Sequence, residues 1–180
     1  MANLRREELR REAARMFATF GFHGVSIEDL GAAVGISGPG VYRHYPSKAA
    51  LLADLLVSIS EELLAGGSAE VALGGGPLLT LERLVDRHLR FSLGAPDLIS
   101  VHDRDRASLA EADGGQVRRL QRAYVELWVD QLVGLDPAMS RPTARARARA
   151  TFGLLNSTPH QVKDVAPALL RRMALAALLA

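Results

Sequence analysis

Residues 35–48 read GISGPGVYRHYPSK, and this stretch decides the fold. Two glycines and a proline, the poorest helix formers, stand directly before a cluster of aromatic and basic residues. Proline is tolerated in the first turn of a helix, where its missing N–H would have no partner, and glycine there lets the backbone approach another surface closely. The stretch predicts a short helix over residues 37–45 that is capped by Ser37, ends before Pro46 and presents its N-terminus to a partner.

The residues before this stretch predict two more helices. Apolar residues recur at helical spacing over residues 4–20, and Gly21 ends that segment. Ser26 precedes Asp29 by three residues, which is typical of an N-cap with an acidic first turn, so a second short helix begins there and ends near Gly35. Two short capped helices joined by about one turn of chain are typical of a helix-turn-helix.

The rest of the chain indicates helices and no strand, so the predicted fold class is all-α. The glycine-rich segment of residues 66–77 lacks a phosphate-binding lysine and is expected to be a flexible connection. Gly114-Gly115 is expected to separate two helices. The remaining helices are predicted at residues 47–66, 78–93, 97–112, 116–134, 142–156 and 164–179.

Composition limits the class of protein. The chain has 180 residues, 48% of them hydrophobic, which is enough for a buried core, and it contains no cysteine that could form a disulfide or a thiolate metal site. The charged N-terminal stretch does not resemble a signal peptide, and no apolar run is long enough to cross a membrane. We therefore expect a cytoplasmic protein with no membrane contact.

The net charge of +2 is concentrated near the helix-turn-helix. Residues 1–50 contain seven Lys or Arg and five Asp or Glu, whereas the rest of the chain contains fifteen of each. Tyr42, Arg43, His44 and Lys48 supply groups that bind phosphates and base edges. These groups predict DNA as the partner, although the aromatic residues alone fit equally well in a protein core.

Three segments of the sequence resemble the TetR (tetracycline-repressor-like) transcription regulators: residues 21–26 (GFHGVS), 27–37 (IEDLGAAVGIS) and 41–51 (VYRHYPSKAAL). The resemblance covers about residues 9–56, and the chain differs from the common pattern at Pro39 and Tyr45. It implies phosphate contacts at Ser26, Tyr42, His44 and Lys48, and a major-groove face made of Ser37, Gly38, Pro39, Gly40 and Arg43.

The resemblance also implies a domain organisation and further partners. It implies a three-helix DNA-binding domain over residues 1–48 and a helical ligand-binding and dimerisation bundle over residues 49–180. Such proteins bind palindromic operator DNA as homodimers, most often as repressors, and are released by a small effector. A hydrophobic effector is expected here, with an acyl thioester or a related lipid metabolite as the candidate class.

The effector site has no motif of its own. Six residues on inward-looking helix faces combine aromatic walls with few polar groups, as ligand sites do, and each would also fit a plain core. The six predicted ligand-binding residues are His88, Phe91, Tyr124, Trp128, Phe152 and Asn156. No catalytic residue, metal site or cofactor is predicted. The first alternative is a helical protein-interaction module, and the second, with less support, is an enzyme that acts on a small molecule.

The C-terminal helix is apolar around most of its circumference, so it is expected to contact a second subunit. A stripe on the 142–156 helix is expected to complete a four-helix interface between two subunits. The residues expected at this interface are Leu169, Leu170, Met173, Ala174, Ala177 and Leu178, together with Ala144, Ala148 and Phe152.

Overall fold

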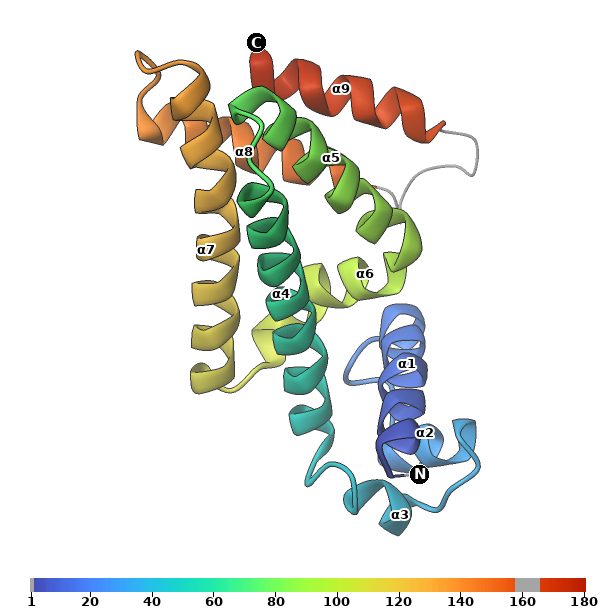
Figure 1. Ribbon diagram of the computed structural model, residues 1–180. Coiled ribbons are helices and arrows are strands. Elements are labelled where there is room, and N and C mark those ends of the chain that lie inside the picture. The colour runs from blue at the N-terminus through green and yellow to red at the C-terminus, as the bar shows by residue number, and fades with distance from the viewer. Residues whose placement is uncertain (1, 158–165) are drawn as a thin grey trace. The chain divides into compact units, whose positions relative to one another are not determined.

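The computed structural model describes residues 2–157 and 166–180, and every regular element among them is helical (Figure 1). This confirms the predicted fold class. The elements are α1 (Ala2–Phe20), α2 (Ile27–Ala33), α3 (Gly38–Tyr42), α4 (Lys48–Ala72), α5 (Pro77–Gly94), α6 (Pro96–Asp105), the 3-10 turn η1 (Arg106–Ser108), α7 (Glu111–Leu135), α8 (Arg141–Leu155) and α9 (Pro167–Leu179).

The helices form two compact units. Unit 1 contains residues 1–59 and 97–117, and unit 2 contains residues 60–96 and 118–180. These units are defined by packing, whereas the predicted division at residue 48 concerns function and stays a prediction. Helix α4 runs through the boundary between residues 59 and 60 without a break (Figure 1).

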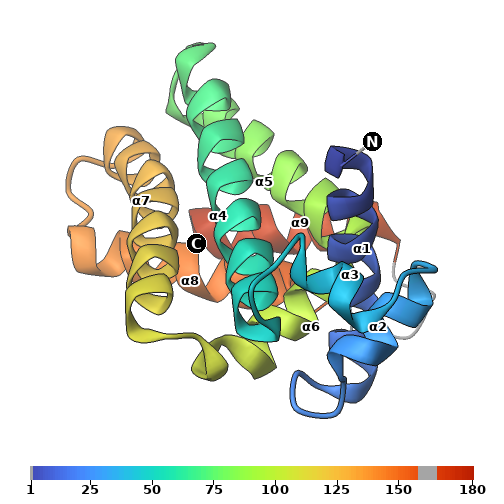
Figure 2. The same ribbon diagram turned by 90° about the horizontal axis from the view of Figure 1, so that it is seen from below.

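Unit 1 is built around α1, which buries Leu9, Ala13 and Phe17 with the first half of α4. Helices α2 and α3 lie against each other as the predicted helix-turn-helix (Figure 2). Helix α6 joins this unit because Arg104 donates hydrogen bonds to the carbonyl oxygens of Phe17 and Ala18 at the end of α1. The Phe17 carbonyl also accepts from the backbone N–H of Gly21, so Arg104 adds a second donor there and supplies one to Ala18 in the last turn of α1.

The turn between α2 and α3 depends on two glycines. Gly35 follows α2 with a φ of +70°, a left-handed conformation that side chains other than glycine rarely adopt. A Cβ atom on Gly31 would lie 2.6 Å from the carbonyl oxygen of Ile36 and 3.2 Å from Cγ2 of Val41. The absence of side chains at these positions therefore allows α2 and α3 to pack closely.

Unit 2 is a bundle of the second half of α4 with α5, α7, α8 and α9. Its core includes Leu84, Trp128 and Leu155, all fully buried. Helix α9 contacts α8 and α5, and the Arg171 guanidinium lies 2.6 Å from the Asp86 carboxylate of α5.

Two predicted helix breaks are wrong. Gly66 and Gly67 lie inside α4, which continues to Ala72, and Gly114-Gly115 lies inside α7, which begins at Glu111. Glycine costs a helix about 1 kcal/mol relative to alanine, and both helices continue in spite of that cost. The chain instead turns at residues 74–76, where three glycines have positive φ angles.

The predicted helix over residues 97–112 is also divided. Helix α6 ends at Asp105, the 3-10 turn follows, and Leu109 has an extended backbone. The predicted helix over residues 37–45 is shorter, because α3 ends at Tyr42 in a turn over Arg43 and His44. Residues 164 and 165 of the last predicted helix lie outside the described residues.

The apolar faces of α8 and α9 are oriented differently from the prediction. Leu170, Ala174 and Leu178 are buried within unit 2, as are Ala144 and Ala148. These residues are core because α8 and α9 pack on each other through them. The outward faces carry Leu169, Met173 and Leu179 on α9 and the small residues Ala146, Ala150 and Gly153 on α8.

Candidate functional site

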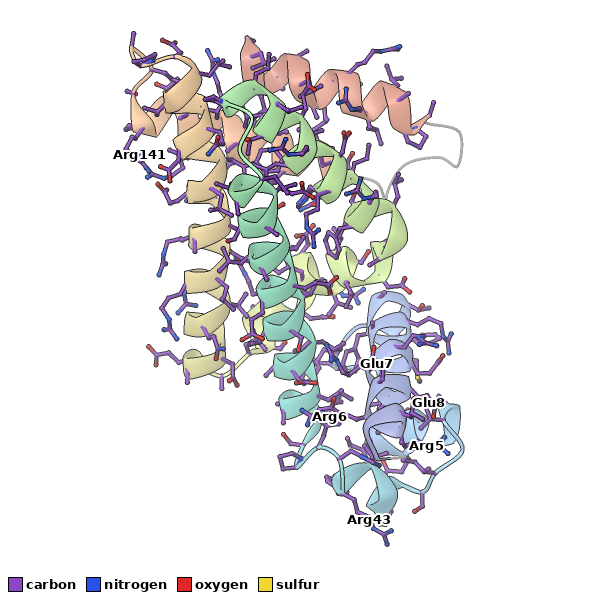
Figure 3. The ribbon with its side chains drawn as sticks, viewed as in Figure 1. Arg5, Arg6, Glu7, Glu8, Arg43 and Arg141 are labelled. Atoms are coloured by element: carbon purple, nitrogen blue, oxygen red, sulfur yellow. The ribbon has the colours of Figure 1, made fainter. Side chains whose placement is uncertain are left out.

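The exposed end of α3 carries the side chains best placed to meet a partner. Arg43 is the C-cap residue of α3 and extends away from the ribbon into open space (Figure 3). No acidic side chain among the described residues pairs with Arg43. Tyr42 is 53% exposed, and Pro39 is exposed in the first turn of the helix. A free guanidinium beside an exposed phenol can donate hydrogen bonds to base edges or phosphates.

The two cap serines already make hydrogen bonds within the chain. The Ser26 hydroxyl accepts from the backbone N–H of Asp29 at 3.0 Å and donates to its carboxylate at 2.6 Å, while the Ser26 backbone N–H donates to the same carboxylate. These bonds hold the pKa of Asp29 below its ordinary value. Ser37 accepts from the backbone N–H of Gly40 at 3.3 Å. Both serines therefore fix the starts of their helices.

Three other predicted DNA-contacting residues are less exposed than Arg43. Gly38 is buried, and a Cβ atom there would lie 3.2 Å from the carboxylate of Glu28 on α2. Gly40 and His44 are half-buried. Gly38 thus serves the packing of α3 on α2.

Lys48 lies at the start of α4 and holds the segment before α2. Its ammonium group donates to the carbonyl oxygens of Phe22 at 2.7 Å and Val25 at 2.6 Å, and it lies 4.5 Å from the centre of the Phe22 ring. The ammonium group has three donors, so one stays available for a phosphate.

Tyr45 forms a structural cluster that the sequence does not reveal. The Tyr45 hydroxyl donates to the Asp54 carboxylate at 2.7 Å and accepts from the Arg6 guanidinium at 3.1 Å. Burial, followed by the bond to Asp54, raises the pKa of Tyr45 to about 12. Figure 3 labels Arg6 on α1, and the cluster ties α1 to the first half of α4.

The six residues predicted to bind a small molecule lie together in unit 2. The Phe152 ring is central, with its centroid 4.7 Å from Trp128, 4.9 Å from His88 and 5.5 Å from Tyr124. The Phe91 ring is 5.9 Å from His88. These residues come from α5, α7, α8 and the C-cap of α8, and the two that lie farthest apart in the sequence, His88 and Asn156, are separated by 68 positions.

His88 is neutral and satisfied on both ring nitrogens. Asn156 accepts through its carbonyl oxygen at 2.9 Å, so Nε2 carries the proton, and Nδ1 accepts from the Tyr124 hydroxyl at 3.3 Å. Burial lowers the pKa of His88 to about 4 and raises the pKa of Tyr124. The polar groups of the cluster are therefore uncharged near neutral pH.

Two fully buried side chains of unit 2 contain a polar atom that has no hydrogen-bond partner among the described residues. These atoms are Nε1 of Trp128 and Oγ1 of Thr151. A buried N–H without an acceptor is costly, and the polar group beside Trp128 Nε1 is the Tyr124 hydroxyl, which interacts with that indole. Phe91, Phe152 and Asn156 are only half-buried, so the cluster reaches the edge of the core.

The described residues offer little support for other kinds of site. Within residues 2–157 and 166–180, no group of three or more metal-binding side chains comes together. None of the helices in those ranges combines the length and apolar character that crossing a lipid bilayer requires.

Comparison with known proteins agrees with this geometry. Residues 9–55, which contain the helix-turn-helix, match the model of the bacterial regulatory proteins of the tetR family. The HTH-type transcriptional repressor KstR2 of Rhodococcus jostii (strain RHA1) is 26% identical over 129 residues. That alignment covers 71% of this chain and 63% of the repressor, so the chain matches less than two thirds of this relative.

Solved structures share the whole fold. A TetR-family transcriptional regulator from Bordetella parapertussis 12822 superposes with a TM-score of 0.88 at 26% identity, covering 97% of this chain and 93% of that one. AibR, solved in complex with isovaleryl coenzyme A and operator DNA, superposes with a TM-score of 0.82 at 16% identity and covers 97% of both chains. The fold, the helix-turn-helix and the sequence match agree, and residues 9–55 match the tetR family of bacterial regulatory proteins.

Proposed function

We propose that this protein is a ligand-responsive transcriptional regulator, most simply a repressor. It binds palindromic operator DNA as a homodimer and leaves the DNA when a small hydrophobic effector binds. The observation that carries the proposal is the exposed end of α3 in a tetR-type helix-turn-helix, where Arg43 and Tyr42 face solvent. The proposal places the protein in the cytoplasm and assigns it no catalytic step.

In this proposal α3 enters the major groove of DNA. Arg43 reads base edges, because its guanidinium is unpaired and can form two parallel hydrogen bonds to guanine. Tyr42 donates its hydroxyl to a phosphate. The further proposed phosphate contacts are Ser26, His44 and Lys48, and the further groove-facing residues are Ser37, Pro39 and Gly40, whereas the buried Gly38 packs on α2.

The effector binds at the aromatic cluster of unit 2. The rings of Phe91, Phe152 and Tyr124 supply apolar contacts, and Nε1 of Trp128 supplies a donor. An uncharged oxygen, such as the carbonyl of an acyl thioester, matches that donor. The complex of AibR with isovaleryl coenzyme A supports this class of effector. The proposal therefore assigns effector binding and dimerisation to the segment from residue 49 onward.

The dimer forms through the outward faces of α8 and α9. Met173 is 45% exposed on α9, beside exposed Leu169. On α8 the small residues Ala146, Ala150 and Gly153 would let a partner helix approach closely. A two-fold axis through this surface gives the two copies of α3 that a palindrome requires.

The proposal is tested by selecting bound duplexes from a random-sequence pool and measuring affinity against salt. We expect a palindromic consensus, with the logarithm of affinity falling linearly as the logarithm of salt concentration rises. A protein-interaction module would enrich no sequence. For the effector, Trp128 fluorescence is titrated with isovaleryl coenzyme A and stearoyl coenzyme A, and the compound that changes fluorescence should also release the selected duplex.

A further inference from the structure

The side chain of Glu28, in the first turn of α2, lies over the first residue of α3. A Cβ atom on Gly38 would lie 3.2 Å from Oε1, 3.6 Å from Cγ and 3.7 Å from Cδ of Glu28. Gly38 is buried, although the residues on either side of it, Ser37 and Pro39, are exposed. The missing side chain at Gly38 therefore leaves room for Glu28, whose carboxylate is held at the start of α3.

The Glu28 carboxylate has no countercharge within the part of the chain that the structure describes. The side chain is exposed and forms no ion pair with any arginine, lysine or histidine of residues 2–157 and 166–180. Its neighbour Asp29, in contrast, accepts hydrogen bonds from the backbone N–H and the hydroxyl of Ser26 and completes the capping box of α2. The cap of α2 therefore does not depend on Glu28, and both carboxylate oxygens of Glu28 can accept a hydrogen bond from a partner.

Glu28 lies among the residues that the proposed function places on DNA. Ser26, two residues earlier, is a proposed phosphate contact, and Pro39 is the exposed residue next to Gly38 on the groove-facing side of α3. Phosphates repel an unpaired carboxylate, so a glutamate on this surface weakens binding to DNA unless a base donates a hydrogen bond to it. A carboxylate in such a place discriminates between sequences rather than adding affinity for all of them.

Cytosine is the base that suits a carboxylate in the major groove. It presents the N4 amino donor there, whereas guanine presents two acceptors and thymine presents an acceptor and a methyl group. Adenine also has an amino donor, but the acceptor N7 lies beside it on the same base. A carboxylate that accepts from cytosine N4 meets no acceptor on that base.

We propose that Glu28 recognises a cytosine at one position of each operator half-site by accepting a hydrogen bond from its N4 amino group. This role rests on the proposed function and adds a residue of α2 to the groove-facing residues of α3. With any other base at that position, the carboxylate stays beside phosphates and base acceptors without a donor, and the duplex binds less tightly. Gly38 contributes the space that lets the Glu28 side chain reach the start of α3.

Two substitutions at Glu28 and one control separate hydrogen bonding, reach and charge. Glu28→Gln keeps the length of the side chain but adds a donor, and glutamine pairs with N6 and N7 of adenine. Glu28→Asp keeps the charge and the acidic first turn of α2, while its carboxylate is one methylene shorter. Glu62→Gln is the control, because Glu62 is an exposed glutamate of α4 that also lacks an ion pair within the described ranges.

The experiment selects duplexes from a random-sequence pool with each protein. Affinity is then measured for four duplexes that differ only at the cytosine position of both half-sites. The wild type should bind the cytosine duplex about tenfold more tightly than the other three, as one specific base contact allows. Glu28→Gln should prefer adenine at that position, and Glu28→Asp should lose the preference. Glu62→Gln should select the wild-type consensus.

Three results overturn the assignment. They are a wild-type consensus retained by both Glu28 variants, an equal change in Glu62→Gln, and a wild-type preference for guanine or thymine at the position that responds to Glu28. Thermal unfolding is measured for each protein, and if Glu28→Gln does not fold, Glu28→Asp decides alone. A wild-type protein that selects no duplex overturns the proposed function as well, whereas a selected palindrome that the Glu28 variants share overturns only the role of Glu28.

Discussion

Arg43 is the residue that we expect to recognise the DNA sequence, rather than to add affinity for DNA of any sequence. Its guanidinium is exposed at the end of α3 and lies free of acidic partners among the described residues. We predict that Arg43→Ala lowers the ratio of operator affinity to random-DNA affinity. The corresponding free energy of discrimination should fall by about 1 to 3 kcal/mol, the value of one bidentate base contact. Competition binding with selected and random duplexes measures this ratio.

Tyr42→Phe and Arg122→Ala complete that test. Tyr42→Phe removes only a hydroxyl that we assign to a phosphate, so it should weaken both kinds of duplex equally. Arg122 is an exposed arginine on α7 and serves as the matched loss of one positive charge. An unchanged ratio in Arg43→Ala would show that base recognition lies elsewhere on α3.

Because His88 is buried, we predict that the free energy of unfolding decreases in acid. Its pKa is about 4 in the folded chain, against an ordinary value of 6.5. Above pH 6.5 the imidazole is neutral in both states. As pH falls from 6.5 toward 4, the unfolded chain binds a proton that the folded chain does not, so the free energy of unfolding should fall by about 1.4 kcal/mol per pH unit.

The measurement is urea unfolding of the wild type and His88→Gln at pH 7 and pH 5. The wild type should lose about 2 kcal/mol more than the variant over this interval, because other titrating groups are common to both proteins. Equal losses would mean that His88 is protonated in the folded state or that its surroundings admit water.

The helix-turn-helix gives a prediction at the scale of the element. A methyl group at Gly31 would meet the Ile36 carbonyl oxygen at 2.6 Å, and a backbone atom cannot rotate away as a side chain can. Gly31→Ala should therefore lower the free energy of unfolding by about 1 to 3 kcal/mol, as overpacking does. Gly94→Ala is the control, since nothing lies within 4 Å of its new methyl group. Equal stabilities would show that α2 and α3 separate easily.

Glycines also show how far the sequence predicts the elements. At Gly21 and Gly35 the expected helix ends are correct, because the chain there adopts positive φ angles that glycine reaches more easily than other residues. At Gly66 and Gly67 the same residue type serves close packing by Arg87 and Tyr124. That use depends on contacts from α5 and α7, so a local signal predicts a break where the helix continues.

The residues of the candidate sites could be predicted from the sequence, but most of their contacts could not. Helical spacing identifies the inward faces that carry His88, Tyr124 and Phe152, and these faces do meet. The hydrogen bonds of His88, however, join residues 36 and 68 positions apart, which no local pattern specifies. Similarly, the motif draws attention to Lys48 as a basic residue, while its bonds to two backbone carbonyls emerge only from the packing of unit 1.

The whole molecule needs a second copy of itself if α3 is to read a palindrome, and the surface of α9 indicates where that copy binds. Of the apolar residues on this helix, Leu170 and Leu178 fill the core of unit 2, so a charge there would unfold the bundle. Met173 faces outward and is 45% exposed, so Met173→Glu should leave the fold intact and place a carboxylate in the dimer interface.

Sedimentation should show the wild type as a dimer and Met173→Glu as a monomer, with the thermal unfolding of unit 2 unchanged. Operator affinity should fall by about a hundredfold or more, because two linked α3 helices gain that much from binding together. Leu73→Glu, at a site 71% exposed beyond the end of α4, should stay dimeric and bind normally. A Met173→Glu protein that remains dimeric and binds the palindrome would place the two-fold axis on another face, and the outward residues of α8 and α9 would then require a different partner.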